Sequence, residues 1–291
     1  MDTAQHPRRE ERFTIRTADL DASGAASPVA LCGLLQELAV NHADELGLGM
    51  KSLIEGSGHT WMLSRMRIVF AAPARPSFGE EIRILTWPAG AGRVATVRCF
   101  RVQDSRGAEI LRADTEWFYV HIARQRIARL PDEVMELLPR LAPRIELPET
   151  SEKFEFPEAT RDEGGPPPAP RPSPPFPDTA EIRVRRADLD INNHVNHTHI
   201  LAWLFEPLDL QMESGHLPPT VDHTSQDTAS QLSTSKPRPP LRTMDVVFRQ
   251  EARLGDTLVS AASRDGSRTF HKILRGDTVI AQAVLTWENR A

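Results

Sequence analysis

Two short segments, Ala18-Asp19-Leu20-Asp21 and Ala187-Asp188-Leu189-Asp190, carry the same four residues far apart in the chain. Further matches follow each of them in the same order. Met66–Phe70 is similar to Met244–Phe248, Gly79-Glu80 to Gly255-Asp256, and Trp117 to Trp287. Each match is weak alone, but their shared order predicts a chain built from two copies of one structural unit.

Both copies are expected to contain a strand, a long helix and several antiparallel strands. In the first copy, Ser27 suits an N-cap, Pro28 the first helical turn and Gly47 the C-terminal stop. Between them an apolar stripe at helical spacing includes Leu31, Leu35 and Leu38. A helix with one apolar stripe needs a sheet against which to bury it. The sequence therefore predicts an α+β tandem (double) hotdog, with a long central helix wrapped by a curved antiparallel sheet in each half.

Alternating and β-rich segments supply the strands. In the first half we expect them at 13–16, 61–70, 81–87, 93–104 and 108–121, with a short helix at 131–138. In the second half we expect them at 180–186, 244–250, 257–263, 268–274 and 278–287. Ile200, Leu201, Leu204 and Leu208 mark the second long helix, which Pro207 should kink or end, and residues 213–240 should form an exposed loop.

A Pro-rich segment separates the halves. It includes Gly164-Gly165-Pro166-Pro167-Pro168, whose composition cannot build a packed core. We therefore expect an N-terminal hotdog at 10–145, a linker at 146–178 and a C-terminal hotdog at 179–291.

Composition restricts the class of protein. Of the 291 residues, 40% are hydrophobic and 26% are charged, which is typical of a globular protein. A net charge of −5 gives no basic footprint for nucleic acid. Two cysteines are too few for a disulfide framework, which favours a reducing compartment such as the cytoplasm. No apolar run is long enough to span a membrane, and no metal-ligand spacing is present, so we expect neither a membrane span nor a metal or other cofactor.

The polar stretch after the second repeat start carries the candidate chemistry. If the chain is locally extended there, Asp190, Asn192 and His194 share one face. A neutral His takes a proton from water, a carboxylate orients it, and an Asn amide donates to an oxyanion. The alternative is that these residues form an ordinary turn and helix cap. At the same places the first half has Asp21, Ser23 and Ala25, which predicts catalysis in the second half and substrate accommodation in the first.

At this point the chain resembles the acyl-acyl carrier protein thioesterases, the plant plastid enzymes and their bacterial relatives. The resemblance covers most of both halves. Its motifs are the helix segment 35–42, the segments 61–69 and 127–134, the loop 188–196, and Trp203 with Glu206-Pro207. The resemblance implies the catalytic groups Asp190, Asn192 and His194, joined by Glu251 from a later strand. Ala252 stands where an older proposal for the family places a nucleophilic Cys, so activated water is the expected nucleophile.

The resemblance also implies candidate pocket residues, namely Trp61, Met62 and Arg65, with Gln36 and Asn41 bordering the acyl chain. His42 lies on the apolar stripe and is expected to be a satisfied core His. Backbone N–H groups at the start of the second long helix are candidate oxyanion donors. His197 and Ile200 depart from the Asn and Tyr usual in the family after His-Val-Asn, which leaves the substrate preference undecided.

The implied function is hydrolysis of fatty acyl-acyl carrier protein, which ends chain elongation in fatty acid biosynthesis. The implied partner is the acyl carrier protein with its phosphopantetheine arm, and the implied location is the bacterial cytoplasm. Three alternatives stay open: an acyl-CoA thioesterase on the same fold, a hydratase or dehydratase of acyl thioesters, and a non-catalytic acyl-binding protein. A monomer and a homodimer are both compatible with a tandem chain.

Overall fold

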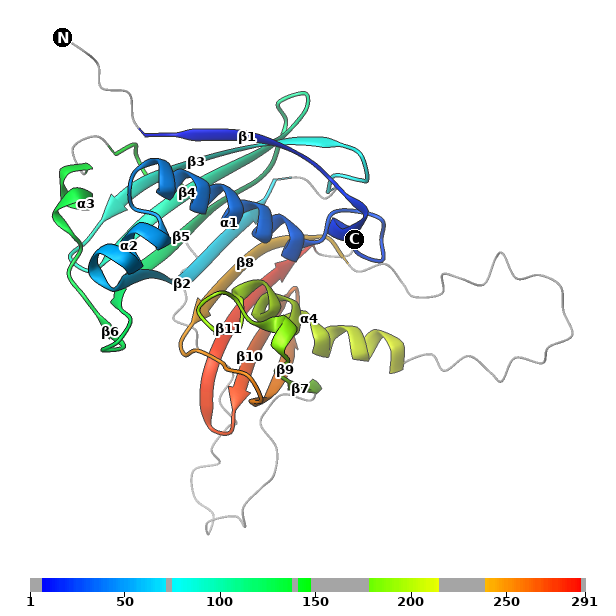
Figure 1. Cartoon of the computed structure of the whole chain (residues 1–291). Coiled ribbons are helices and arrows are strands. Elements are labelled where there is room, and N and C mark those ends of the chain that lie inside the picture. The colour runs from blue at the N-terminus through cyan, green and yellow to red at the C-terminus, as the bar shows by residue number, and fades with distance from the viewer. Residues whose placement is uncertain (1–6, 72–74, 138–140, 148–177, 215–238, 289–291) are drawn as a thin grey trace, which may run out of the picture. The chain divides into compact units, whose positions relative to one another are not determined.

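The structure is a computed structural model that describes residues 7–71, 75–137, 141–147, 178–214 and 239–288 (Figure 1). It divides into two compact units. The first comprises Met1–Ser151 together with Leu241–Arg249, and the second comprises Glu152–Pro240 together with Gln250–Ala291. Most of the predicted linker, 148–177, lies outside the described residues, as do 215–238 of the predicted loop.

The first unit is organised around α1 (Pro28–Glu45), which begins and ends where the sequence predicts. Ser27 caps it, because its Oγ accepts a hydrogen bond from the Ala30 amide at 2.9 Å. The buried stripe contains Leu31, Leu35 and Leu38 among others. A second helix, α2 (Met50–Ser57), was not predicted, since its eight residues are too few to show a clear period. It ends at Gly58, whose φ of +69° suits glycine.

The sheet of the first unit is antiparallel and has the strand order β1-β3-β4-β5-β2-β8, with β6 paired to β5. Figure 1 shows α1 lying across one face of this sheet. The first strand was predicted to end at Arg16, but β1 ends two residues earlier, at Thr14. The other predicted strands match the observed ones to within a few residues. The bounds are β1 (Arg9–Thr14), β2 (His59–Phe70), β3 (Glu81–Ala91), β4 (Ala95–Asp104), β5 (Glu109–His121), β6 (Arg126–Ile127) and β8 (Leu241–Phe248), and the short helix is α3 (Asp132–Leu137).

The helix-facing side of the sheet forms the core of this unit. Phe100 on β4 is opposite Ala113 on β5 and Thr86 on β3, and all three are buried. Arg98, two residues before Phe100, shares this side and donates from Nη1 to His42 Nδ1 at 2.9 Å. Burial, reinforced by the charges of Arg98 and Arg9, lowers the pKa of His42 to about 4. His42 is therefore a neutral, hydrogen-bonded core residue, as expected.

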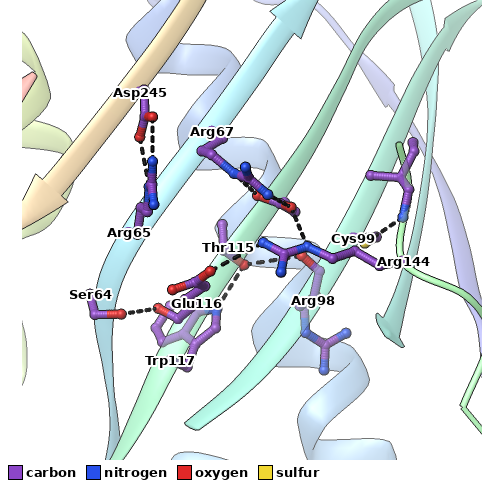
Figure 2. Close-up of polar contacts among 12 residues, drawn as sticks. Ser64, Arg65, Arg67, Arg98, Cys99, Thr115, Glu116, Trp117, Arg144 and Asp245 are labelled. Atoms are coloured by element: carbon purple, nitrogen blue, oxygen red, sulfur yellow. Dashed lines mark hydrogen bonds and ion pairs between the residues drawn. The ribbon is translucent and has the colours of Figure 1, made fainter. Parts of the chain in front are cut away.

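The opposite side of the sheet carries an ion-pair cluster (Figure 2). The buried carboxylate of Asp114 accepts from Arg67 Nε at 2.9 Å and from Arg144 Nε at 2.7 Å. Arg144 belongs to an irregular segment, 141–147, in which the Pro143 carbonyl accepts from Trp87 Nε1 at 3.0 Å. The Ile145 amide donates to Cys99 Sγ at 3.3 Å. These contacts hold the segment 141–147, which follows the strands of the first repeat, against the sheet of the first unit.

The second unit repeats the plan with a smaller sheet of order β11-β10-β9-β7, and α4 (His197–Ser214) contacts β9, β7 and β10. Of the two effects expected of Pro207, a kink or an end, the end is wrong, because α4 continues through Pro207 to Ser214. None of the described helices is long and apolar enough to cross a membrane. The strand bounds are β7 (Asp178–Arg183), β9 (Thr257–Asp265), β10 (Arg268–Arg275) and β11 (Thr278–Trp287).

Candidate active site

The stretch that precedes α4 is a tight turn, so the premise of an extended chain is wrong. Leu189 and Val195 form an antiparallel bridge, and Asn193 at the turn has a φ of +60°. The Asp190 carboxylate Oδ1 accepts from the amides of Asn192 at 2.8 Å and His194 at 3.3 Å. Asp190 therefore fixes the backbone of the turn rather than contacting the imidazole of His194.

A second carboxylate, which sequence analysis did not single out, anchors the base of this turn. Asp188 is fully buried and accepts from the Arg185 amide, Nε and Nη2 at 2.7, 3.2 and 2.8 Å. Burial alone would raise the pKa of Asp188, but the hydrogen bonds and charge of Arg185 outweigh it and hold that pKa below its usual range. The sequence feature that could have indicated this contact is the Arg-x-x-Asp spacing of Arg185 and Asp188, which also occurs at Arg16 and Asp19.

The side chains of His194 and Glu251 meet although they are far apart in the sequence. His194 Nε2 lies 3.0 Å from Glu251 Oε2, and the two side chains are 29% and 38% exposed. The Val195 amide donates to the Ala252 carbonyl at 2.9 Å, which ties the two loops together and fixes this approach. Arg253, which sequence analysis missed, reaches the same Glu251 oxygen with Nη2 at 3.4 Å. The pair is thus a carboxylate-oriented imidazole that remains open to solvent.

The helix start beneath this pair is capped by its own chain. Asn196 Oδ1 accepts from the Thr198 amide and hydroxyl, both at 2.9 Å. The amides of His199 and Ile200 bond to the Asn196 carbonyl. These three amides are therefore engaged, which argues against them as the predicted oxyanion donors.

The first unit contains the same turn without the same chemistry. Leu20 and Ala26 form the matching bridge, and the Ala26 amide donates to Pro76 as Val195 does to Ala252. This hydrogen bond places Arg75 at the position of Glu251, and Ala25 stands at that of His194. Arg75 Nη1 pairs with Asp21 Oδ2 at 2.6 Å instead. The turn is therefore part of the fold in both units, whereas the second unit adds the pair of His194 and Glu251.

The five predicted pocket residues all lie in the first unit, but they differ in burial and in the contacts that they make. Gln36 and Asn41 are partly exposed on α1. Trp61 donates from Nε1 to the Leu48 carbonyl at 2.9 Å and packs against a buried cluster beneath α2, whereas Met62 follows it on β2 and is half-buried. Figure 2 shows Arg65 paired with Asp245, with Nε–Oδ1 at 2.9 Å. The guanidinium of Arg65 is therefore engaged across β2 and β8, and the pocket roles stay predictions.

Within the described part of the chain, no group of three or more His, Cys, Asp or Glu side chains is placed to hold a metal ion. The arrangement that this part of the chain does offer is a base with its orienting carboxylate, beside an Asn-containing turn. Such an arrangement suits proton abstraction from water.

Comparisons with known proteins identify the family to which the chain is similar. A family model described as acyl-ACP thioesterase N-terminal domain matches residues 8–138, and one described as the C-terminal domain matches 177–226. Together they cover more than half of the chain. A chloroplastic acyl-[acyl-carrier-protein] hydrolase from Cuphea viscosissima is 25% identical over 97% of this chain. A chloroplastic oleoyl-acyl carrier protein thioesterase from Arabidopsis thaliana is 25% identical over 71%. The chain spans 59% and 56% of the lengths of these two relatives.

Solved structures share the fold at low identity. A 12:0-ACP thioesterase from Umbellularia californica superposes with a TM-score of 0.74 at 18% identity, covering 97% of this chain and 98% of its own. A putative oleoyl thioesterase from Lactobacillus plantarum gives 0.72 at 18% identity, covering 99% and 98%. The predicted tandem hotdog is confirmed by this likeness and by the two helix-on-sheet units.

Proposed function

The chain belongs to the acyl-acyl carrier protein thioesterase family, and we propose that it hydrolyses the thioester of fatty acyl-acyl carrier protein to release a free fatty acid. The observation that carries the proposal is the 3.0 Å approach of His194 Nε2 to Glu251 Oε2 in the second unit. The matching position in the first unit lacks both groups. A turn needed only for folding would keep neither of them.

The hydrogen bond assigns the proton on His194. A carboxylate can only accept, so in the neutral imidazole Nε2 carries the hydrogen and Nδ1 carries the lone pair. No described residue bonds to Nδ1, which is therefore the nitrogen that takes a proton from the attacking water. Glu251 holds the ring in this tautomer and stabilises the imidazolium that forms.

Hydrolysis then proceeds in two balanced steps. The water oxygen bonds to the thioester carbonyl carbon while His194 takes its proton, and the Asn192 amide donates to the developing oxyanion. The carbon–sulfur bond then breaks, and the imidazolium returns its proton to the departing thiolate. The products are a carboxylic acid and the free thiol, and Asp190 keeps the turn rigid through its bonds to the Asn192 and His194 amides.

The remaining assignments belong to the same proposal. The first unit accommodates the acyl chain, the acyl carrier protein is the partner, and the product enters fatty acid metabolism. The cytoplasm is the proposed compartment, a choice supported by Cys32 and Cys99, which are buried and unpaired.

The test is release of thiol from acyl-acyl carrier protein and acyl-CoA substrates, C8 to C18, by wild type and His194→Ala. Release from carrier-protein substrates that the variant has lost supports the proposal. Preferential release from acyl-CoA would transfer the chain to the first alternative. Binding of acyl groups without any release would contradict catalysis and favour the binding-protein alternative.

A further inference from the structure

The carboxylate of Glu251 is partly open to solvent, so packing alone does not select its orientation. The side chain is 38% exposed, and two donors share one of its oxygens. His194 Nε2 lies 3.0 Å and Arg253 Nη2 3.4 Å from Glu251 Oε2. A glutamate side chain has several rotatable bonds and loses much freedom when it is ordered. The position of the Glu251 backbone is therefore what brings the carboxylate within reach of the imidazole.

The loop that carries Glu251 joins β8 to β9 and is closed at its far end by Asp256. Asp256 Oδ2 accepts from the Arg253 amide at 2.9 Å and from Arg275 Nη1 at 2.7 Å. Burial would raise the pKa of Asp256, but these hydrogen bonds and the charges of the two arginines hold that pKa below its usual range. Asp256 is therefore ionised at neutral pH, and its contact with Arg275 is an ion pair.

Arg275 lies on the neighbouring hairpin, at the end of β10, and contacts the loop at two points. Besides its bond to Asp256, Nη1 of Arg275 donates to the backbone carbonyl of Glu251 at 3.4 Å. This second bond is long, so the contact with Asp256 is the firmer of the two. One guanidinium nitrogen thus joins the residue that bears the catalytic carboxylate to the residue that closes its loop.

The first unit shows that the fold of the loop does not need this arginine. The corresponding loop there is closed in the same way, since the Ser77 amide donates to Glu80 Oε2 at 2.6 Å. The pairing of the two hairpins places Asp104 where Arg275 stands, and the Asp104 carboxylate accepts from two amides of its own turn. In the described part of that unit no arginine pairs with Glu80. The arginine therefore accompanies the catalytic carboxylate rather than the loop.

We infer that Arg275 is a positioning residue, which holds the Glu251 backbone where the Glu251 carboxylate meets His194. This inference rests on the proposed function and adds to it a residue outside the reacting groups. Because Arg275 acts through Glu251, its loss should slow the step in which the imidazole takes a proton from water. Binding of the acyl group should be unaffected, so the change is expected in kcat and not in KM.

The first test compares Arg275→Ala with wild type in thiol release from one acyl-acyl carrier protein substrate. We expect kcat to fall about tenfold, less than the roughly hundredfold that a misplacement of about 1 Å can cost, because the backbone bonds of the loop remain. KM should stay within about twofold of wild type. Arg275→Lys keeps a positive donor near the two oxygens and should recover part of the loss. Arg106→Ala, which removes an exposed arginine from the β4–β5 turn, is the matched control.

A double-mutant cycle with Glu251→Ala separates positioning from a general effect on the fold. If Arg275 acts through the Glu251 carboxylate, Arg275→Ala should lower kcat little further once that carboxylate is gone. Equal factors in the two backgrounds, wild-type kcat in Arg275→Ala, or failure of this variant to fold by circular dichroism would each overturn the inference and leave the proposed function intact. Failure of the wild type to release thiol from any acyl thioester would instead overturn both.

Discussion

Replacing Glu251 by Gln separates the chemical role of the His194–Glu251 pair from any structural one. Gln keeps the size of the side chain, and its amide oxygen can still accept from His194 Nε2, so only the negative charge is removed. That charge stabilises the imidazolium formed during water attack. We expect kcat to fall on the order of a hundredfold, the lower end of what a positioned base contributes. This corresponds to about 2.7 kcal/mol of transition-state stabilisation.

The same geometry predicts a small effect on folding. Since the two side chains are 29% and 38% exposed, the pair contributes at most about 1 kcal/mol to stability, as is typical of solvent-screened ion pairs. The Tm of Glu251→Gln should therefore change by no more than a few degrees.

The assay is initial-rate thiol release at saturating acyl-acyl carrier protein, combined with thermal unfolding followed by circular dichroism. Glu181→Gln, an exposed carboxylate on β7, is the matched control and should behave as wild type in both measurements. A Glu251→Gln enzyme that keeps more than a tenth of wild-type kcat would refute the assignment of Glu251. A large fall in Tm would show instead that the pair holds the fold.

Three further predictions concern buried ionisable groups. Asp114→Ala leaves Arg67 and Arg144 without their shared carboxylate and should lower the free energy of unfolding in urea by about 3–5 kcal/mol; a loss below 1 kcal/mol would contradict the role of this cluster. The pKa of Asp188 is below its usual range, so its stabilisation is present above the unfolded pKa and is lost as pH falls through the folded pKa. Asp188→Asn should therefore be less stable at neutral pH and lose less stability in acid, and an acid-unfolding curve parallel to wild type would argue against this. Burial lowers the pKa of His271 from its usual value near 6.5 to about 4. Between these values the unfolded chain binds a proton that the folded chain does not, so stability falls as pH drops, and His271→Gln should reduce that slope in urea titrations at pH 4 to 7.

The sequence by itself determined the elements whose signals are local and repeated. The helix stripe, the Ser27 cap and the turn residues act within a few positions, so α1 and most strands are found where they were expected. Because the repeat motifs occur in the same order in both halves, they predicted the tandem hotdog and located the turn that carries His194. They also located the degenerate copy at Ala25.

Signals that depend on unpredicted packing were the ones that failed. Pro207 is helical in α4 although local chemistry favours a stop there. The Trp203 carbonyl, to which Pro207 has no N–H to donate, accepts a hydrogen bond from Ser260 Oγ on β9 at 2.6 Å instead. Arg65 is a different case: no local pattern indicates its ion pair with Asp245, 180 positions away, while its predicted pocket role stays a prediction.

Only the tertiary structure decided what the polar turn does. The sequence placed Asp190, Asn192 and His194 on one extended face, whereas Asp190 bonds to the backbone of a tight turn. The contact of His194 with Glu251 and the presence of Arg253 depend on the bond between Val195 and Ala252, which joins segments more than fifty residues apart. Local sequence fixes which groups are available for chemistry, but the orientation of an imidazole is set by the carboxylate that the fold brings to it.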